Sequence, residues 1–357
     1  MDRTYDVLVV GGGAAGLSAG LALARARRAV LVVDAGAPRN APAGHVHNYL
    51  GREGTPPGEL LAVGRAELAG YGGEVMSGRA VRAESLDGRP SGPGFRVELA
   101  DGRSVLARRL LMATGLVDEL PDIPGLHQRW GREVLHCPYC HGWEVRDQAI
   151  GVLATGPMAT HQALLFRQWS PDVTLFQHTA APPSADEREQ LAARGIPVVT
   201  GEVVGLELTD DGLTGVRLRS GQVVPRQALT VMPRFTARAD LLAPLGLAPT
   251  ELRVDGYVVG SYVPADPTGA TAIPGVWVAG NVADVRAGVI NAAAAGLNVA
   301  AAVNADLVAE DTRRAVAEHR RGSGTPAGSA GASAEPFSAE HERELSERVL
   351  GDRRHGW

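Results

Sequence analysis

The chain has 357 residues, of which 45% are hydrophobic and 21% are charged, and its formal net charge is −5. This length predicts about two domains with full hydrophobic cores, and the mildly acidic balance without a basic stripe argues against nucleic-acid binding. No run of about 18 apolar residues predicts a membrane span, and no signal-peptide pattern opens the chain, so we expect a cytoplasmic protein without a membrane partner.

The N-terminal stretch has the pattern of a dinucleotide-binding unit. Residues 5–10 predict a buried strand, followed by the glycine-rich turn of residues 11–16 and a helix to about Arg27. A second strand, residues 29–33, ends at Asp34. Glycines let the backbone approach a pyrophosphate at a helix N-terminus, and the acid can accept hydrogen bonds from a ribose hydroxyl. Strand, turn, helix and acid together predict dinucleotide binding.

A long loop rich in proline and glycine follows Asp34 and predicts a ligand wrap. Within it, Arg39 could reach a phosphate, whereas His45 and His47 are as well explained as solvated loop residues. Next come a predicted helix over 58–71, strands around 74–84, 94–99 and 104–112, and a small-residue turn at Ala113-Thr114-Gly115.

The only two cysteines of the chain, Cys137 and Cys140, form a C-x-x-C pair flanked by His136 and His141. A structural zinc site needs four ligands, and two further thiolates or imidazoles at matching spacing are missing, so no metal is predicted. The spacing suits a redox dithiol, and imidazoles can hold or move protons near it. The alternative is two buried structural cysteines.

A second nucleotide half-site is predicted downstream, in a degraded form. A strand over 148–153 enters the turn of residues 154–159 with Ala154 where the first glycine belongs, and a helix follows to about Trp169. The next strand, 172–176, is followed by no arginine of the kind that would hold an NADPH 2′-phosphate. Use of NADPH is therefore in doubt.

The C-terminal part returns to the first type of signal and then changes composition. A strand and glycine turn are predicted at 275–282 and an alanine-rich helix at 288–309. Residues 322–336 predict a flexible linker, and the charged segment that follows predicts a solvated tail. A sharper alternative is that Trp357 folds back onto a surface of the protein.

Four motifs, at 11–16, 113–115, 137–140 and 279–284, resemble in order and spacing the low-molecular-weight thioredoxin reductases. Closer still, Gly36-x-Pro38-Arg39-Asn40 and Cys137-Pro-Tyr-Cys140-His141-Gly142-Trp143-Glu144 resemble the dithiol oxidases of gliotoxin and holomycin biosynthesis. The resemblance implies an α/β flavoprotein homodimer with two Rossmann-like three-layer nucleotide-binding domains, the second inserted in the first. It implies an FAD domain over 1–118 and 253–310, an NAD(P)-binding-like domain with the C-x-x-C pair over 119–252, and a linker and tail over 311–357.

The same resemblance implies roles for individual residues. Cys140 would face the flavin, Cys137 would exchange with substrate, and His141, or else His136, would be the acid/base. The expected cofactor contacts are Gly11, Gly13, Ala14, Ala15, Gly16, Asp34, Ala35, Arg39, His47, Asn48, Val81, Ala113, Thr114, Gly115, Gly280, Asn281, Val289 and Ile290.

Departures from the reductases favour a different reaction. His141 stands where they carry an acid after the second cysteine, and Asn281 stands where they carry an aspartate. Both departures are shared with the dithiol-oxidase subgroup, and the degraded nicotinamide half-site leaves oxygen as the natural acceptor. We therefore expect an FAD-dependent enzyme that oxidises a small dithiol with oxygen as acceptor. The alternatives are a disulfide reductase that uses NADPH or ferredoxin, and a flavin-binding redox sensor without turnover.

Overall fold

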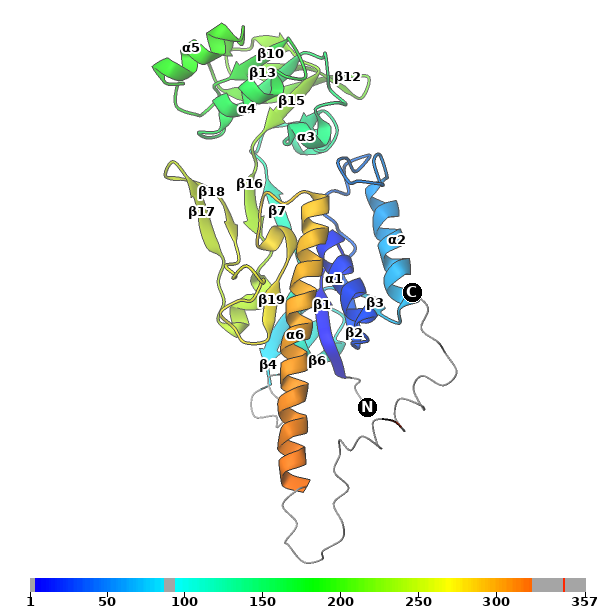
Figure 1. Ribbon diagram of the computed structural model, residues 1–357. Helices are drawn as coiled ribbons and strands as arrows, with labels where there is room; N and C mark the ends of the chain where they lie inside the picture. Colours follow the sequence, from blue (N-terminus) through cyan, green and yellow to red (C-terminus); the bar gives the residue numbers. More distant parts are fainter. Residues whose placement is uncertain (1–3, 87–93, 323–342, 344–357) are drawn as a thin grey trace, which may run out of the picture. The chain divides into compact units, whose positions relative to one another are not determined.

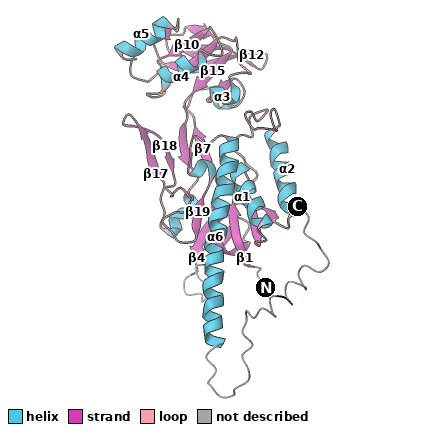
Figure 2. Cartoon of the chain, viewed as in Figure 1, coloured by secondary structure: helices cyan, strands magenta, loops and turns pink. Residues whose placement is uncertain are grey.

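The computed structural model describes residues 4–86, 94–322 and 343. The described residues up to Asp311 form one compact unit, and those described from Thr312 onward belong to a second. The first unit holds two largely parallel sheets with layers on both faces (Figures 1 and 2), which confirms the predicted α/β class with two Rossmann-like domains. Most of the tail predicted over 311–357 lies outside the described residues.

The first sheet has seven strands in the order β3-β2-β1-β6-β5-β4, and β19 also pairs with β6. β5 pairs antiparallel with the first half of β6, and β19 pairs parallel with its second half. The strands are β1 (Thr4–Val10), β2 (Val30–Asp34), β3 (Glu74–Ser77), β4 (Ala80–Ser85), β5 (Phe95–Leu99), β6 (Ser104–Met112) and β19 (Val276–Val278).

Alternate residues of β1 point to opposite faces of this sheet, and both faces are buried. Val7 and Val9 lie in the core that the sheet forms with its helices, and Leu8 and Val10 lie in the core on the other face. A strand buried on both faces needs a continuous apolar run, which explains the sequence of β1. The covering elements are α1 (Ala14–Arg25), α2 (Pro57–Gly70) and α6 (Val289–Gly322) on one face and η2 (Asp240–Leu245) on the other.

The second sheet is entirely parallel, in the order β11-β10-β9-β15-β8. One face packs on α4 and α5, and the other packs on the antiparallel sheet β12-β13-β14. The elements are β8 (Val134–Leu135), β9 (Ile150–Leu153), β10 (Val173–Phe176), β11 (Val198–Val199), β12 (Val203–Thr209), β13 (Gly212–Leu218), β14 (Val223–Pro225), β15 (Ala228–Val231), η1 (His127–Arg129), α3 (Pro138–His141), α4 (Ala159–Phe166) and α5 (Ala185–Ala193).

A four-stranded sheet that the sequence did not predict joins the two parts. Its order is β17-β18-β16-β7, and β16 pairs antiparallel with β7, so the chain enters and leaves the intervening segment on adjacent strands. The predicted boundaries at 118/119 and 252/253 stay a prediction, because a single compact unit contains both sheets. The elements are β7 (Leu116–Glu119), β16 (Arg234–Ala237), β17 (Thr250–Val254), β18 (Tyr257–Tyr262) and η3 (Gly280–Val282).

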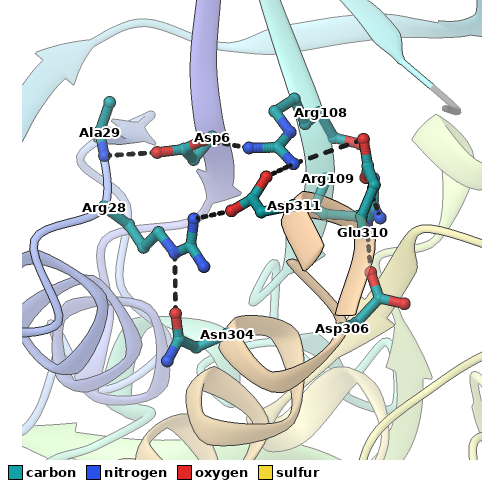
Figure 3. Close-up of polar contacts among 9 residues, drawn as sticks. All are labelled: Asp6, Arg28, Ala29, Arg108, Arg109, Asn304, Asp306, Glu310 and Asp311. Atoms are coloured by element: carbon teal, nitrogen blue, oxygen red, sulfur yellow. Dashed lines mark hydrogen bonds and ion pairs between the residues drawn. The ribbon is translucent and has the colours of Figure 1, made fainter. Parts of the chain in front are cut away.

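Helix α6 is tied to the sheet by a network of ion pairs (Figure 3). Arg109, on β6, is 3% exposed; it donates to Asp306 at 2.6 Å and to Glu310 at 2.5 Å. Arg108 joins Asp6 of β1 to Asp311 of α6 at 2.8 and 2.5 Å. These contacts fix the C-terminal half of α6 against β1 and β6. Because the helix is rigid, they also define the position of its first turn at Val289.

Helix α6 is longer than the predicted 288–309, because helix-forming residues continue to Gly322. By length and hydropathy it is also a candidate membrane span, which the sequence analysis did not anticipate. This is weak evidence, since alanine supplies much of the apolar character. Val299, Val303 and Leu307 lie in the core of the first sheet, as expected of a core helix.

The ion-pair network predicts a stability difference between two arginines. Arg109→Met leaves Asp306 and the buried Glu310 without this partner, so we expect a loss of about 3 kcal/mol in the free energy of unfolding, measured with urea. Arg253→Met is the control: Arg253 and its partner Glu251 are both more than half exposed, and the change should cost less than about 1 kcal/mol. Equal losses would contradict a stabilising role for the network.

Candidate functional site

One cavity of 1820 Å³ brings most of the predicted site residues together. Pockets for drug-sized ligands occupy roughly 300–1,000 Å³, so this volume suits a dinucleotide with room to spare. Its wall is formed by the glycine turn after β1, the loop after β2, the end of β6, the start of α6, and the residues around α3 and α4.

The N-terminus of α1 has open backbone donors at the cavity wall. Gly13 is the N-cap residue, no side chain caps the helix, and no acid lies in the first turn. A Cβ on Gly13 would meet nothing within 4 Å, whereas Gly11 has φ +109° and a Cβ there would lie 2.3 Å from the Ala113 carbonyl oxygen. Free N–H groups and the helix dipole bind anions, so the turn fits the pyrophosphate of FAD.

The acid at the end of β2 lies against the same turn. The Gly12 N–H donates to Asp34 Oδ1 at 3.1 Å, and Arg65 lies 3.8 Å from Oδ2. Asp34 and Ala35 both line the cavity. A carboxylate held beside the phosphate turn is in the position expected for a ribose contact.

The two cysteine sulfurs lie 2.8 Å apart and line the cavity. Cys137 precedes α3, and its pKa is lowered to about 7, chiefly because the Cys140 thiol donates to its sulfur, with help from backbone amides. The pKa of Cys140 is raised, because its proton is held by Cys137 and its site is buried. Within the reduced pair, Cys137 is therefore the thiolate and Cys140 the thiol.

The flanking histidines differ in their surroundings. Burial lowers the pKa of His136 to about 4, and its Nε2 lies 3.1 Å from Met232 Sδ, so this ring is uncharged at neutral pH and a weak base. Burial also lowers the pKa of His141, while Glu144 opposes the shift. His141 Nε2 is buried and has no hydrogen-bond partner among the described residues. That nitrogen is available for proton transfer.

Arg39 lies in the cavity wall, where three of its five N–H groups already have partners among the described residues. Its Nε and Nη2 donate to both carboxylate oxygens of Asp118 at 2.8 and 2.7 Å, and Nη1 donates to Asn281 Oδ1 at 3.3 Å. The group also lies over the Phe235 ring, 5.3 Å from its centroid. Sequence reasoning missed Asp118 and Phe235, because neither has a local motif. These three hydrogen bonds leave one N–H on each of Nη1 and Nη2, so the expected phosphate contact stays a prediction.

The loop after β2 is held against the cysteine helix by two contacts. Asn48, at φ 58°, donates from Nδ2 to the Tyr139 carbonyl at 2.6 Å. His47 lies 2.6 Å from Glu53 and 3.4 Å from Glu144. His47 and Asn48 therefore line the cavity as expected, but the Asn48 amide is used to hold the segment between the two cysteines.

Two predicted cofactor residues lie elsewhere. Val81 is half exposed and does not line the cavity, where the neighbouring residues 78–80 lie instead. Gly16 does not line the cavity either. It packs closely against the glycine turn, since a Cβ there would lie 1.8 Å from the Gly11 carbonyl oxygen. The cavity wall does include Gly11, Gly13, Ala14, Ala15, Ala113, Thr114, Gly115, Gly280, Asn281, Val289 and Ile290.

The degraded half-site has the expected strand–turn–helix form. Ala154 is buried after β9, and Thr155 Oγ1 donates to the Met232 carbonyl at 3.0 Å. After β10, the His178 ring accepts a hydrogen bond from the Val203 N–H, so this side chain is bound to β12. The missing arginines have no substitute in residues 177–181.

Comparison with known proteins gives a family. The model of the pyridine nucleotide-disulphide oxidoreductases matches residues 5–296. Thioredoxin reductase sirT of Leptosphaeria maculans is 29% identical over 321 residues, covering 86% of this chain and 95% of that protein. The crystal structure of HlmI is 47% identical with a TM-score of 0.81, covering 88% of this chain and 96% of that one. An oxidoreductase from Agrobacterium tumefaciens is 37% identical with a TM-score of 0.78, covering 86% and 99%.

These matches confirm the predicted resemblance to thioredoxin reductase-like flavoproteins, closest to the gliotoxin/holomycin-type dithiol oxidase subgroup. They also agree with the uncapped glycine turn and the paired sulfurs in one cavity. The chain belongs to the pyridine nucleotide-disulphide oxidoreductase family and is an FAD-dependent disulfide oxidoreductase.

Proposed function

We propose that this enzyme oxidises a small-molecule dithiol to a cyclic disulfide through Cys137 and Cys140, with oxygen as the final acceptor. The observation that carries the proposal is the contact of the two sulfurs at 2.8 Å in a cavity that also contains the glycine turn. One dithiol and one O₂ give one disulfide and one H₂O₂. In keeping with the resemblance, we propose a cytoplasmic homodimer.

The cofactor is proposed to lie on the cavity wall between the turn of residues 11–15 and the start of α6. Backbone N–H groups at Gly13, Ala14 and Ala15 hold the pyrophosphate, and Asp34 binds the adenosine ribose. FAD, when bound, supplies the two-electron acceptor that restores the Cys137–Cys140 disulfide and passes the electrons to oxygen.

The exchange of disulfides follows from the unequal sulfurs. A substrate thiolate attacks Cys137 of the enzyme disulfide, forms a mixed disulfide and expels Cys140, which takes up a proton. The second substrate thiolate then attacks the substrate sulfur of the mixed disulfide and expels Cys137. A thiol of low pKa leaves faster, and Cys137 has the lowered pKa. The substrate departs as a cyclic disulfide.

His141 is proposed to move the protons of this exchange. It follows Cys140 in the chain, it lines the cavity, and its unpaired Nε2 is free to accept the substrate thiol proton and deliver it to Cys140. His136 is the weaker candidate, because a base with a pKa of about 4 holds little proton near neutral pH.

The degraded half-site favours oxygen over a nicotinamide nucleotide as the second substrate, the one that exchanges electrons with the flavin. Ala154 replaces a turn glycine, and residues 177–181 hold no arginine. The alternative, a disulfide reductase using NADPH or ferredoxin, is supported by the name of sirT, a thioredoxin reductase. The two functions differ in what reduces the flavin.

The purified yellow protein should consume oxygen and release peroxide when dithiothreitol is added. Cys140→Ser should reduce this uptake to background, because the disulfide can no longer form. Under anaerobic conditions, dithiothreitol should bleach the flavin absorbance and NADPH should not. Rapid bleaching by NADPH would favour the reductase and count against the oxidase.

A carboxylate placed before α1 should expel the cofactor. In Gly13→Asp the new side chain has room but occupies the proposed pyrophosphate position, so the ratio of flavin to protein absorbance after desalting should fall at least about tenfold. Gly58→Asp is the control, since it adds the same charge where a Cβ also meets nothing within 4 Å. Full flavin content in Gly13→Asp would place the pyrophosphate elsewhere.

Replacement of His141 should slow proton transfer without loss of flavin. His141→Gln is expected to lower kcat/KM for dithiothreitol oxidation by roughly 10²-fold, the usual contribution of a positioned acid/base. His127→Gln, at an exposed position outside the cavity, should leave the rate unchanged. An unaltered pH–rate profile in His141→Gln would remove His141 from the mechanism.

A further inference from the structure

Arg39 connects the parts of the site that carry the chemistry. Its ion pair with Asp118 reaches β7, its hydrogen bond to Asn281 reaches the turn before α6, and its contact with Phe235 reaches β16. Phe235 also contacts His136: the two rings meet edge-on with their centroids 5.1 Å apart. His136 directly precedes Cys137, so the guanidinium lies one aromatic ring away from the residue beside the exchanging sulfur.

The position of this cation is fixed. Asp118 is only 8% exposed and accepts two parallel hydrogen bonds from Arg39, an arrangement that gives both strength and defined geometry. The Arg39 side chain is 27% exposed and lines the cavity, as do both cysteines. A cation that cannot turn away into solvent exerts a constant field on the groups around it.

We propose that Arg39, held by Asp118 and Asn281, is a positioning residue whose fixed positive charge stabilises the Cys137 thiolate that substrate exchange expels. The inference rests on the proposed exchange at Cys137 but not on oxygen as the acceptor. The phosphate contact expected for Arg39 from the sequence stays a separate prediction.

The charges around the sulfurs agree with this assignment. The hydrogen bond between the two cysteines and burial are the main causes of the pKa shifts of Cys137 and Cys140, and burial is the main cause of the shift of His136. The charge of Arg39 adds a smaller contribution that lowers the pKa of all three groups. The other titratable groups near Cys137 are Cys140 and His141 on α3, His136 before it, and Asp118 on β7, while His47 and Glu144 act on His141. Burial keeps the His136 and His141 imidazoles uncharged at neutral pH. Among the described residues, Arg39 is therefore the permanent cation that acts on the pKa of both sulfurs.

The ion pair allows a test with two variants that remove charges of opposite sign. Arg39→Met removes the cation and should raise the pH at which Cys137 reactivity is half-maximal by about one unit. Asp118→Asn removes the counter-charge and leaves the cation, so the same midpoint should fall by a similar amount. Arg39→Lys keeps the charge without the bidentate contact and should lie between wild type and Arg39→Met.

The measurement is the rate at which iodoacetamide alkylates Cys137 in the anaerobically reduced holoprotein as a function of pH, followed by peptide mapping. It needs neither substrate nor oxygen, so failure of the oxidase proposal does not affect it. The matched control is Arg234→Met, which removes an exposed arginine from the strand that also carries Phe235; the midpoint should not move. Far-ultraviolet circular dichroism checks that each variant is folded.

The outcomes are distinct. Opposite shifts in Arg39→Met and Asp118→Asn support the proposal. A rise of the midpoint in both variants would mean that Asp118 acts mainly by holding the cation beside the sulfurs, which also supports the proposal. An unchanged Cys137 midpoint in Arg39→Met would overturn it, and loss of flavin in the same variant would favour the phosphate contact.

Discussion

The proposed chemistry of this protein depends on the contact between the Cys140 and Cys137 sulfurs, which lie 2.8 Å apart. The Cys140 thiol donates to the Cys137 sulfur, so the proton stays on Cys140 while the charge remains on Cys137. This inequality gives each sulfur a separate part in exchange. A symmetrical pair would have no preferred sulfur for attack and no preferred sulfur for departure.

The environment of the pair maintains this inequality from several directions. Cys137 precedes α3, where backbone amides reach its sulfur, and the loop after β2 holds the intervening residues through Asn48. Burial keeps both neighbouring imidazoles neutral at physiological pH, so they do not add further positive charge. In the proposed mechanism, an uncharged proton carrier, His141, and a fixed cation, Arg39, would have separate roles in a reaction that creates and removes thiolates.

The sequence predicted those features whose signals are local. The strand, glycine turn and helix of residues 4–25, the acid at Asp34 and the C-x-x-C pair were all found, because each depends on periodicity or on spacing within a few residues. The partner of Arg39 could not be found this way, since Asp118 is 79 residues distant and meets it only through packing of β7. Val81 was expected in the cavity from the family resemblance, but residues 78–80 line it instead.

The antiparallel pairing of β7 with β16 has a consequence for the history of the chain. Paired strands lie about 4.8 Å apart, so the polypeptide on either side of residues 120–233 begins and ends at nearly one point. A segment attached in this way can be gained, lost or exchanged by recombination, because a short turn between β7 and β16 can rejoin the rest of the chain. Such modular attachment would allow one flavin scaffold to acquire different electron-transfer modules.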